Sequence, residues 1–210
     1  MEVNQPAPAR VGDRRVRRSR TALMQAAVAL VAERGATAVT VSELAEAADV
    51  SRQLVYQQFG DRDTLLLEAA LDLARRELVP LITQTPQTPG GRTAVLAMTR
   101  HFAHHRSFYR AMLTGPCAFR LNRALHGLLG PFNEQLVRRM SDQPLAPELV
   151  GDLTGFITGG SAAVFNAWVT DGPDPLDPEA FADRLMRMLS VITGALDELA
   201  IALPEKRQRR

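Results

Sequence analysis

The side chains best suited to chemistry in this sequence lie in one short segment, between Ser51 and Gln57. Arg52, Gln53 and Gln57 supply a guanidinium and two primary amides within six residues. A guanidinium can form paired hydrogen bonds with guanine, an amide can do the same with adenine, and Leu54 could contact a thymine methyl group. If a short helix exposes these groups near its N-terminus, the pattern favours reading of base edges in the major groove of DNA.

Two helix starts on either side of a turn would position these groups. Thr40 and Glu43 form a T-x-x-E capping box, in which each side chain satisfies a free backbone N–H of the other residue. Asp49 lies in the turn, and Ser51 is a good N-cap for a second helix over residues 52–58. The segment therefore predicts a helix-turn-helix.

The apolar residues of the same segment are spaced to face a core. Leu44, Ala45 and Ala48 form one stripe on the first helix, and Val55 and Phe59 lie on the inner side of the second. The polar side chains of the second helix are then left on the opposite, outer face.

This segment resembles the N-terminal region of the TetR family of transcriptional regulators, and the resemblance covers residues 17–67. The matching positions are Thr40, Leu44, Ala45, Val50, Ser51, Tyr56, Phe59, Arg62 and Leu65. Three positions depart from the family pattern: Asp49 replaces a turn glycine, Gln58 a common histidine and Arg62 a common lysine. Asp tolerates the left-handed backbone better than most residues, and Gln and Arg keep a donor for phosphate, so the fold is still expected.

The resemblance implies an all-α protein of about nine helices, with a three-helix DNA-binding head and a helical domain for ligand binding and dimerisation. We expect the head to contact a palindromic operator in double-stranded DNA. The expected contact residues are Arg17, Arg18, Thr40, Ser42, Ser51, Arg52, Gln53, Leu54, Tyr56, Gln57, Gln58 and Arg62. Tyr56 could instead pack against the first helix, or do both.

Charge and turn residues divide the chain further. Residues 1–20 hold six arginines against two acidic residues, and residues 205–210 hold four basic residues against Glu205. A basic arm before a helix-turn-helix can bind DNA phosphates, although it could also be only a solvated tail. The expected units are a disordered basic tail (1–12), the helix-turn-helix domain (13–60), a connecting helix (61–84), a linker (85–91), the effector-binding and dimerisation domain (92–203) and a basic C-terminal tail (204–210).

The C-terminal half carries a weaker resemblance to the same family, in residues 104–113 and 156–172. It implies a homodimer paired through the last two helices and a small effector bound among the helices, which we expect to be apolar or aromatic. The bulky residues chosen as its pocket are Phe102, Tyr109, Met112, Phe132, Phe156 and Trp168, although side chains of this kind are more often core. Gly155, Gly159 and Ala163 leave one helix with a small-residue surface for the dimer contact, or for packing within one chain.

Signals for other functions are weak. His101, His104 and His105 could bind a metal, but no further ligand lies at a suitable spacing, so no metal and no cofactor are expected. Cys117, the single cysteine, is at a helix start where a thiolate is favoured, yet a small buried residue is the simpler interpretation. Without a phosphate loop or nucleophile elbow the sequence does not predict an enzyme. A helical enzyme or binding protein with an incidental helix-turn-helix is the alternative.

The composition limits the cellular compartment in which the protein is expected. No apolar run reaches the roughly 18 residues that a membrane-spanning helix needs, and no signal peptide is recognised. The lone cysteine fits a reducing compartment. We therefore expect no membrane partner and a location in the bacterial cytoplasm, where binding to the operator would associate the protein with the nucleoid.

Gly130-Pro131 is expected to break or kink the helix over 117–141.

Overall fold

The computed structural model describes residues 11–84, 91–139 and 145–202. All regular structure in these ranges is helical, as the sequence predicts. The predicted tail over 1–12 lies almost entirely outside the described residues, as do most of the linker over 85–91 and the C-terminal tail. Within the described part, no helix is long and apolar enough to span a membrane.

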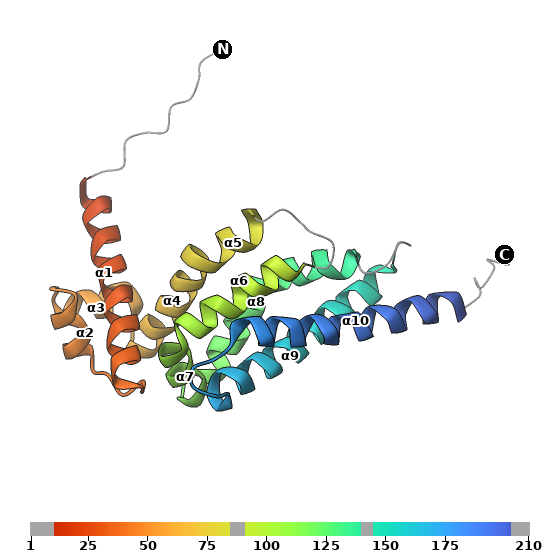
Figure 1. Cartoon of the computed structure of the whole chain (residues 1–210). Coiled ribbons are helices and arrows are strands. Elements are labelled where there is room, and N and C mark those ends of the chain that lie inside the picture. The colour runs from red at the N-terminus through yellow and green to blue at the C-terminus, as the bar shows by residue number, and fades with distance from the viewer. Residues whose placement is uncertain (1–10, 85–90, 140–144, 203–210) are drawn as a thin grey trace, which may run out of the picture.

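The helices follow one another in an order close to the predicted one (Figure 1). Their bounds are α1 (Val11–Arg34), α2 (Val41–Ala47), α3 (Arg52–Phe59), α4 (Arg62–Leu73), the π-helical turn η1 (Ala74–Leu78), α5 (Val79–Gln84), α6 (Arg92–His104), α7 (Arg106–Thr114), α8 (Ala118–Arg138), α9 (Pro147–Asp171) and α10 (Pro178–Ala202). Because α4, η1 and α5 form one uninterrupted run, the described residues contain nine helical segments.

The head at one end of the molecule consists of α1, α2 and α3, closed by the start of α4 (Figure 1). Its core is apolar and fully enclosed, with one large residue from each helix. Leu23 of α1, Leu44 of α2, Val55 of α3 and Leu65 of α4 all have no exposed surface. Burial of such residues is worth about 1.5–3 kcal/mol each, so the short helices α2 and α3 are held by packing more than by their own propensity.

The connecting run, formed by α4, η1 and α5, begins with a local cap, and its helix changes from α-helical to the wider π-helical geometry at η1. The carboxylate of Asp61 accepts a hydrogen bond from the backbone N–H of Thr64, with an Oδ1···N distance of 2.7 Å. The predicted single helix over 61–84 is interrupted by the π-turn η1, just before Pro80. Proline has no N–H and its ring crowds the carbonyl four residues earlier, which here belongs to Arg76, so a wider turn relieves the clash.

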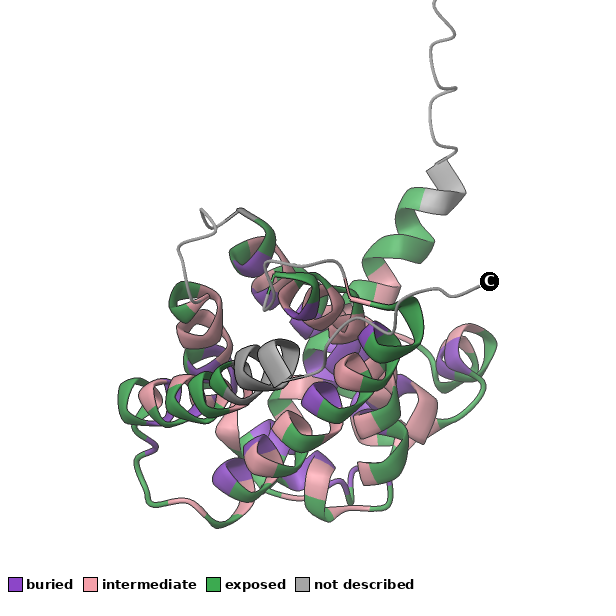
Figure 2. Cartoon of the chain, turned by 90° about the vertical axis from the view of Figure 1, so that its right-hand side faces the viewer, coloured by how far each residue is buried: buried purple, intermediate pink, exposed green. Residues whose placement is uncertain are grey.

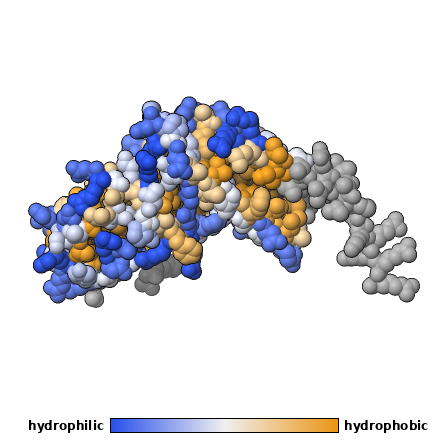
Figure 3. Space-filling model, turned by 90° about the horizontal axis from the view of Figure 1, so that it is seen from below, coloured by the Kyte–Doolittle hydropathy of each residue, from blue (hydrophilic) through white to orange (hydrophobic). Residues whose placement is uncertain are grey.

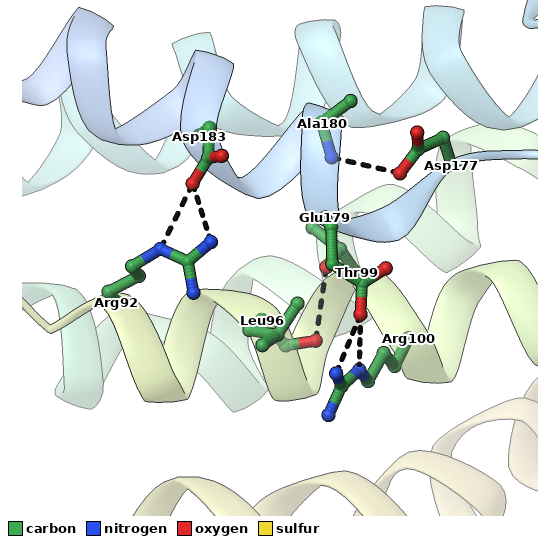
Figure 4. Close-up of polar contacts among 8 residues, drawn as sticks. All are labelled: Arg92, Leu96, Thr99, Arg100, Asp177, Glu179, Ala180 and Asp183. Atoms are coloured by element: carbon green, nitrogen blue, oxygen red, sulfur yellow. Dashed lines mark hydrogen bonds and ion pairs between the residues drawn. The ribbon is translucent and has the colours of Figure 1, made fainter.

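The half of the molecule formed by α6 to α10, which the sequence predicts to be regulatory and which we call the regulatory half, is built by pairing helices that are distant in sequence. α8 packs along α9, and α6 packs along α10. Arg92 bonds to Asp183 and Arg100 to Glu179 across the α6–α10 contact, with N···O distances of 2.7 and 2.6 Å (Figure 4). These ion pairs are exposed and add only about 0.2–1 kcal/mol each, so apolar packing holds the helices together. In the burial view, buried positions lie on the sides of the helices that face one another (Figure 2).

The head is docked firmly on the regulatory half. α1 packs on α7, and α4 contacts α8. One apolar cluster runs continuously from Leu23 in the head to Tyr109 in α7 and Phe181 in α10. The contact is close at Gly115, where an added Cβ would lie 2.7 Å from the hydroxyl oxygen of Thr37. Movement in either part must therefore be accommodated by the other.

One prediction about helix geometry is corrected. α8 continues through Pro131 without a break. The predicted break is therefore wrong: proline removes one hydrogen bond within a helix, and packing against α9 supports α8 on both sides of this position.

Candidate DNA-binding surface and regulatory cavity

Helix α3 presents a polar ridge supported from behind. Arg52, Gln53 and Gln57 are exposed, while Val55 and Phe59 on the other side are buried. The start of the helix is fixed by Ser51, whose hydroxyl oxygen accepts a hydrogen bond from the backbone N–H of Leu54 at 3.3 Å. The ridge therefore has free donors and acceptors on a rigid base.

The turn before α3 adopts the conformation that the sequence allows. Asp49 has φ 52°, which is the left-handed region. The N–H of Asp49 donates to the carbonyl of Glu46 at 3.0 Å, and that of Val50 to the carbonyl of Ala45 at 2.9 Å. The hydrogen bonds that close the turn therefore form even though Asp49 stands where the family pattern commonly has glycine.

The start of α2 is held by a network around one carboxylate. The capping box forms as predicted, since the N–H of Thr40 donates to Glu43 Oε2 at 2.6 Å and the N–H of Glu43 donates to Thr40 Oγ1 at 3.2 Å. Arg34 of α1 donates to the other oxygen of Glu43 at 2.5 Å. This hydrogen bond, together with those from Thr40, lowers the pKa of Glu43 to about 2. The network fixes α2 against α1.

Arg20 is a positioning residue that the sequence analysis did not single out. Its guanidinium lies 4.2 Å from the ring centre of Phe59 and donates to the carbonyl of Gln58 at 3.0 Å. It also pairs with Glu68 of α4, with an N···O distance of 3.4 Å. Arg20 thus ties α1 to the end of α3 and to α4. Sequence spacing offered no signal, because Arg20 lies within a run of arginines.

The remaining predicted contact residues divide into accessible and engaged groups. Arg17, Arg18 and Ser42 are exposed, as is Tyr56, whose exposure of 55% argues against a core role for its ring. The others are less accessible or already bonded.

Three predicted contact residues are less accessible than expected. Leu54 is half-buried. Arg62 bonds to the carboxylate of its neighbour Asp63 at 2.7 Å. The side-chain amide of Gln58 is enclosed and has no hydrogen-bond partner, so it does not face outward as a phosphate donor. The sequence pattern did not resolve which of the polar and apolar side chains at the edge of the outer face of α3 are enclosed.

The first turns of α1 carry the basic arm. The helix begins at Val11, and all residues from 14 to 18 are exposed. In Figure 1 this end of α1 projects beyond the rest of the head. Four arginines (Arg14, Arg15, Arg17 and Arg18) are therefore presented on a helix.

An apolar cavity of about 340 Å³ lies in the regulatory half. This volume is within the range of about 300–1,000 Å³ that is typical of small-molecule sites. Phe102, Phe132 and Phe156, three of the six residues chosen for the effector pocket, line it. Much of the lining is aliphatic and was not predicted, including Met98 of α6 and Leu129 of α8.

The other three predicted pocket residues belong to the core. Tyr109 and Met112 have no exposed surface and do not line the cavity. Trp168 stacks on Phe181, with ring centres 4.1 Å apart and planes at 9°. Bulk and helical spacing identify buried residues, but they do not say on which side of a helix a cavity is left.

The cavity has a polar strip on α8 and α9. Asn166 donates to the amide oxygen of Asn122 at 2.8 Å, and Asn133 donates to the hydroxyl of Thr158 at 2.9 Å. His126 lies between them along α8 and also lines the cavity. These groups are amides, a hydroxyl and an imidazole, and among the described lining residues Arg139 at the end of α8 is the one that carries a permanent charge.

The small residues predicted for the dimer contact do not all face the same way. Gly155 and Ala163 are exposed. Gly159 is half-buried, and a Cβ placed on it would lie 4.0 Å from the ring of His126, so this glycine faces α8 of its own chain.

The outer surface of α9 and α10 carries large apolar side chains. Phe156 is 68% exposed and Val191 is 74% exposed. In the space-filling view apolar residues gather at the end of the molecule away from the head (Figure 3).

Cys117 has no sign of reactivity. It is 2% exposed, and burial raises the pKa of its thiol. The thiolate that its place at a helix start could favour is therefore disfavoured by desolvation.

The comparisons with known proteins agree with this geometry. Residues 23–69 match the family model described as bacterial regulatory proteins, tetR family. No curated protein matches the chain significantly in sequence.

Several solved structures share the fold over most of both chains. A putative TetR-family regulator from Rhodococcus sp. is 18% identical, covers 84% of this chain and 98% of its own, and has a TM-score of 0.60. The TetR family repressor AlkX from Dietzia sp., implicated in biodegradation of n-alkanes, is 22% identical, with 83% and 97% covered and a TM-score of 0.56. The dihydroxyacetone kinase operon activator DhaS is 15% identical, with 84% and 97% covered and a TM-score of 0.57.

At these identities the solved structures show the fold alone, whereas the family model matches the helix-turn-helix itself. Members of this family are DNA-binding regulators and not enzymes. Residues 23–69 thus carry the N-terminal helix-turn-helix domain of the TetR family of bacterial regulatory proteins, and the chain as a whole shares the all-helical fold of solved TetR-family regulators.

Proposed function

We propose that this protein is a homodimeric transcriptional repressor, released from a palindromic operator by a small, neutral and largely apolar effector. The observation that carries the DNA-binding part is the exposed ridge of α3. Arg52, Gln53 and Gln57 are exposed there on a helix anchored by Val55 and Phe59. In this proposal Arg52 reads guanine, the two glutamines read adenine, and Tyr56 and the arginines of α1 contact phosphates.

The apolar surface of α9 and α10 supports the dimer. Side chains as large as Phe156 and Val191 are costly to leave in water, and a second copy of the chain would cover them. Two heads related by a two-fold axis would then reach half-sites about one helical turn apart, roughly 34 Å. Gly159 is left out of the proposed interface because it faces His126.

The cavity supports the effector. Its aliphatic and aromatic lining favours an apolar body, and the amides of Asn122 and Asn133 favour one hydrogen-bonding group on that body. We expect the effector to lower operator affinity by linkage, since a ligand shifts an equilibrium only by its differential affinity for two states, typically about 1–3 kcal/mol.

A gel-shift titration with the DNA upstream of the protein's own gene tests the proposal. We expect specific retardation, with two protomers per operator by sedimentation. Arg52→Ala should relax preference at one base position per half-site, worth roughly 1–3 kcal/mol of discrimination. Arg75→Ala is the matched control, because Arg75 is an exposed arginine on η1 outside the head.

Equal weakening on all sequences would show that Arg52 contacts only phosphate, and no specific retardation would overturn the proposal. Neutral apolar compounds that release the operator should also perturb the fluorescence of Trp168, whose ring lies 6.1 Å from Phe165 in the cavity wall. A reporter fused to the same promoter gives the sign of regulation, and activation would replace repression in the proposal.

A further inference from the structure

Three potential metal ligands converge where the connecting run meets the regulatory half. Glu77 of η1 lies beside His101 of α6 and His105, which follows the last residue of α6. His105 Nε2 is 2.6 Å from Glu77 Oε2, and His101 Nδ1 is 3.5 Å from the same oxygen. One donor atom from each residue lies within 4.8 Å of the other two.

The fold supplies the ligand that sequence spacing lacks. His101 and His105 are one helical turn apart, the spacing at which two imidazoles can share an ion. Glu77 precedes His105 by 28 residues and is brought to them by the packing of η1 on α6. The wide π-turn contributes to this placement, and such turns occur frequently at functional sites.

Burial and neighbouring groups shift the pKa of two of the three side chains. Burial is the main cause that lowers the pKa of His101 to about 4, so its imidazole is neutral near pH 7. Partial burial by itself would raise the pKa of Glu77, but its hydrogen bond to His105 and the two nearby imidazoles outweigh this and lower the pKa.

A buried hydroxyl orients the deeper imidazole. Tyr109 has no exposed surface, and its hydroxyl lies 2.9 Å from His101 Nε2. This contact occupies one ring nitrogen and leaves Nδ1 directed at Glu77. Ligating histidines commonly have a partner on the second ring nitrogen in this way.

We propose that Glu77, His101 and His105 bind a divalent first-row transition metal ion such as Zn²⁺. The ligand atoms are Glu77 Oε2, His101 Nδ1 and His105 Nε2, and a water molecule completes a tetrahedral set. Two imidazoles and one carboxylate are ligands that suit zinc, whereas magnesium and calcium prefer oxygen.

The required rearrangement is small. Bonds of about 2.0–2.2 Å in tetrahedral geometry separate the ligand atoms by roughly 3.3 Å. The contact between Glu77 and His105 must lengthen from 2.6 Å, and both ligand atoms must come closer to His101 Nδ1 from separations that are all within 4.8 Å. The Glu77 side chain is 42% exposed, so it can rotate and also gives the ion a path from solvent. His101, at 3% exposure, stays fixed.

The bound ion would join η1 to α6 directly. η1 continues the run that starts at Asp61, immediately beyond the reading helix α3. Occupancy of the site would thus stabilise the contact between the connecting run and the regulatory half, independently of whether a ligand fills the apolar cavity.

Titration of the full-length, chelator-treated protein with Zn²⁺ tests the proposal. We expect one ion per chain by calorimetry and a rise in melting temperature. Co²⁺ should give the visible absorption bands of a tetrahedral site. Glu77→Gln and His105→Gln should each lower the affinity by more than about 100-fold, since even loss of an outer partner commonly costs 10–100-fold.

Two further variants separate a metal site from adventitious binding. His104→Gln is the matched control, because His104 is an exposed neighbour outside the cluster. It should leave affinity and absorption bands unchanged. Tyr109→Phe keeps the ring and removes the hydroxyl, and it should weaken binding by about 10–100-fold.

Far-ultraviolet circular dichroism without metal confirms that each variant is folded before it is titrated. Less than one ion per chain would overturn the proposal. So would an equal loss in His104→Gln and His105→Gln, or retention of tight binding by Glu77→Gln. In any of these cases the cluster would be a hydrogen-bonded contact only.

Discussion

The helix-start contacts of the head and the contacts between helices of the regulatory half differ in the sequence distance that they bridge. At the helix starts of the head, Thr40 bonds to Glu43, Ser51 to Leu54 and Asp61 to Thr64, and each pair is three residues apart. In the regulatory half, the comparable contacts join residues far apart in the chain. Asn122 and Asn166 are 44 positions apart, and Arg92 and Asp183 are 91. Local contacts define where helices begin, whereas distant ones define which faces meet.

This difference has an energetic consequence. A helix-start hydrogen bond is worth about 1 kcal/mol and leaves its groups exposed to water when it is lost. A buried contact between distant segments costs more to lose, because the remaining partners are enclosed. Substitutions at the enclosed contacts of the regulatory half should therefore be more destabilising than those at the caps of the head, whereas its exposed ion pairs, such as that of Arg92 with Asp183, should contribute little.

The largest effect is expected at Arg106. Its guanidinium donates to the carbonyls of Gly172 at 2.6 Å and Pro173 at 2.8 Å, just beyond the end of α9. A third bond, 3.2 Å long, goes to the carbonyl of Val169. Arg106→Met removes all three donors while keeping an apolar stem, and should lower the free energy of unfolding by about 2–4 kcal/mol. Urea denaturation measures this loss.

Arg110→Met is the matched control for this substitution, because Arg110 is an exposed arginine one turn further along α7. Its effect should stay within about 0.5 kcal/mol. If the two variants unfold at the same urea concentration, the contacts at the end of α9 contribute little and the contrast between the two regions fails.

An intermediate effect is expected at Gly115, where the head meets the regulatory half. The Cβ of an alanine would lie 2.7 Å from Thr37 Oγ1 and 2.9 Å from the carbonyl oxygen of Ala111. The second of these atoms is backbone and cannot move aside easily. Gly115→Ala should therefore destabilise the protein by about 1–3 kcal/mol through overpacking.

At Gly127 the same substitution by alanine should have the opposite effect on stability. It lies inside α8, and an added Cβ would meet nothing within 4 Å. Gly127→Ala should raise stability by about 0.5–1 kcal/mol, because glycine is the poorer helix former. Thermal melts of both variants measure the signs. A stabilised Gly115→Ala would mean that the head is docked more loosely than the structure indicates.

The same distinction explains what could be predicted from the sequence. The capping box at Thr40, the N-cap at Ser51 and the left-handed turn at Asp49 are written in neighbouring residues, so the helix-turn-helix was recognisable. The match of residues 23–69 to the family model rests on the same local pattern.

The cavity and the histidine cluster were harder to predict because they depend on how helices meet. Phe102 lines the cavity whereas Tyr109, seven residues later, is core. Periodicity places both on buried faces and does not say which neighbour each one meets. Glu77 gave no signal near the histidines, because only packing of η1 on α6 brings it there.

The smallest effect should come from a local contact in the head, and its dependence on pH identifies it. The pKa of Glu43 is lowered from 4.5 to about 2, first by the hydrogen bond from Arg34 and then by those from Thr40. A carboxyl group whose pKa is lower in the folded state stabilises the fold above its ordinary pKa. That contribution is lost as the pH falls from about 4.5 towards 2. Glu43→Gln should therefore melt at a lower temperature than the wild type at pH 7, and the difference should shrink progressively below pH 4.5.

Glu46→Gln, an exposed change on the same helix, is the matched control, and its melting temperature should not converge on that of the wild type as the pH falls. A difference for Glu43→Gln that stays constant with pH would show that the carboxylate charge is not what holds α2 to α1.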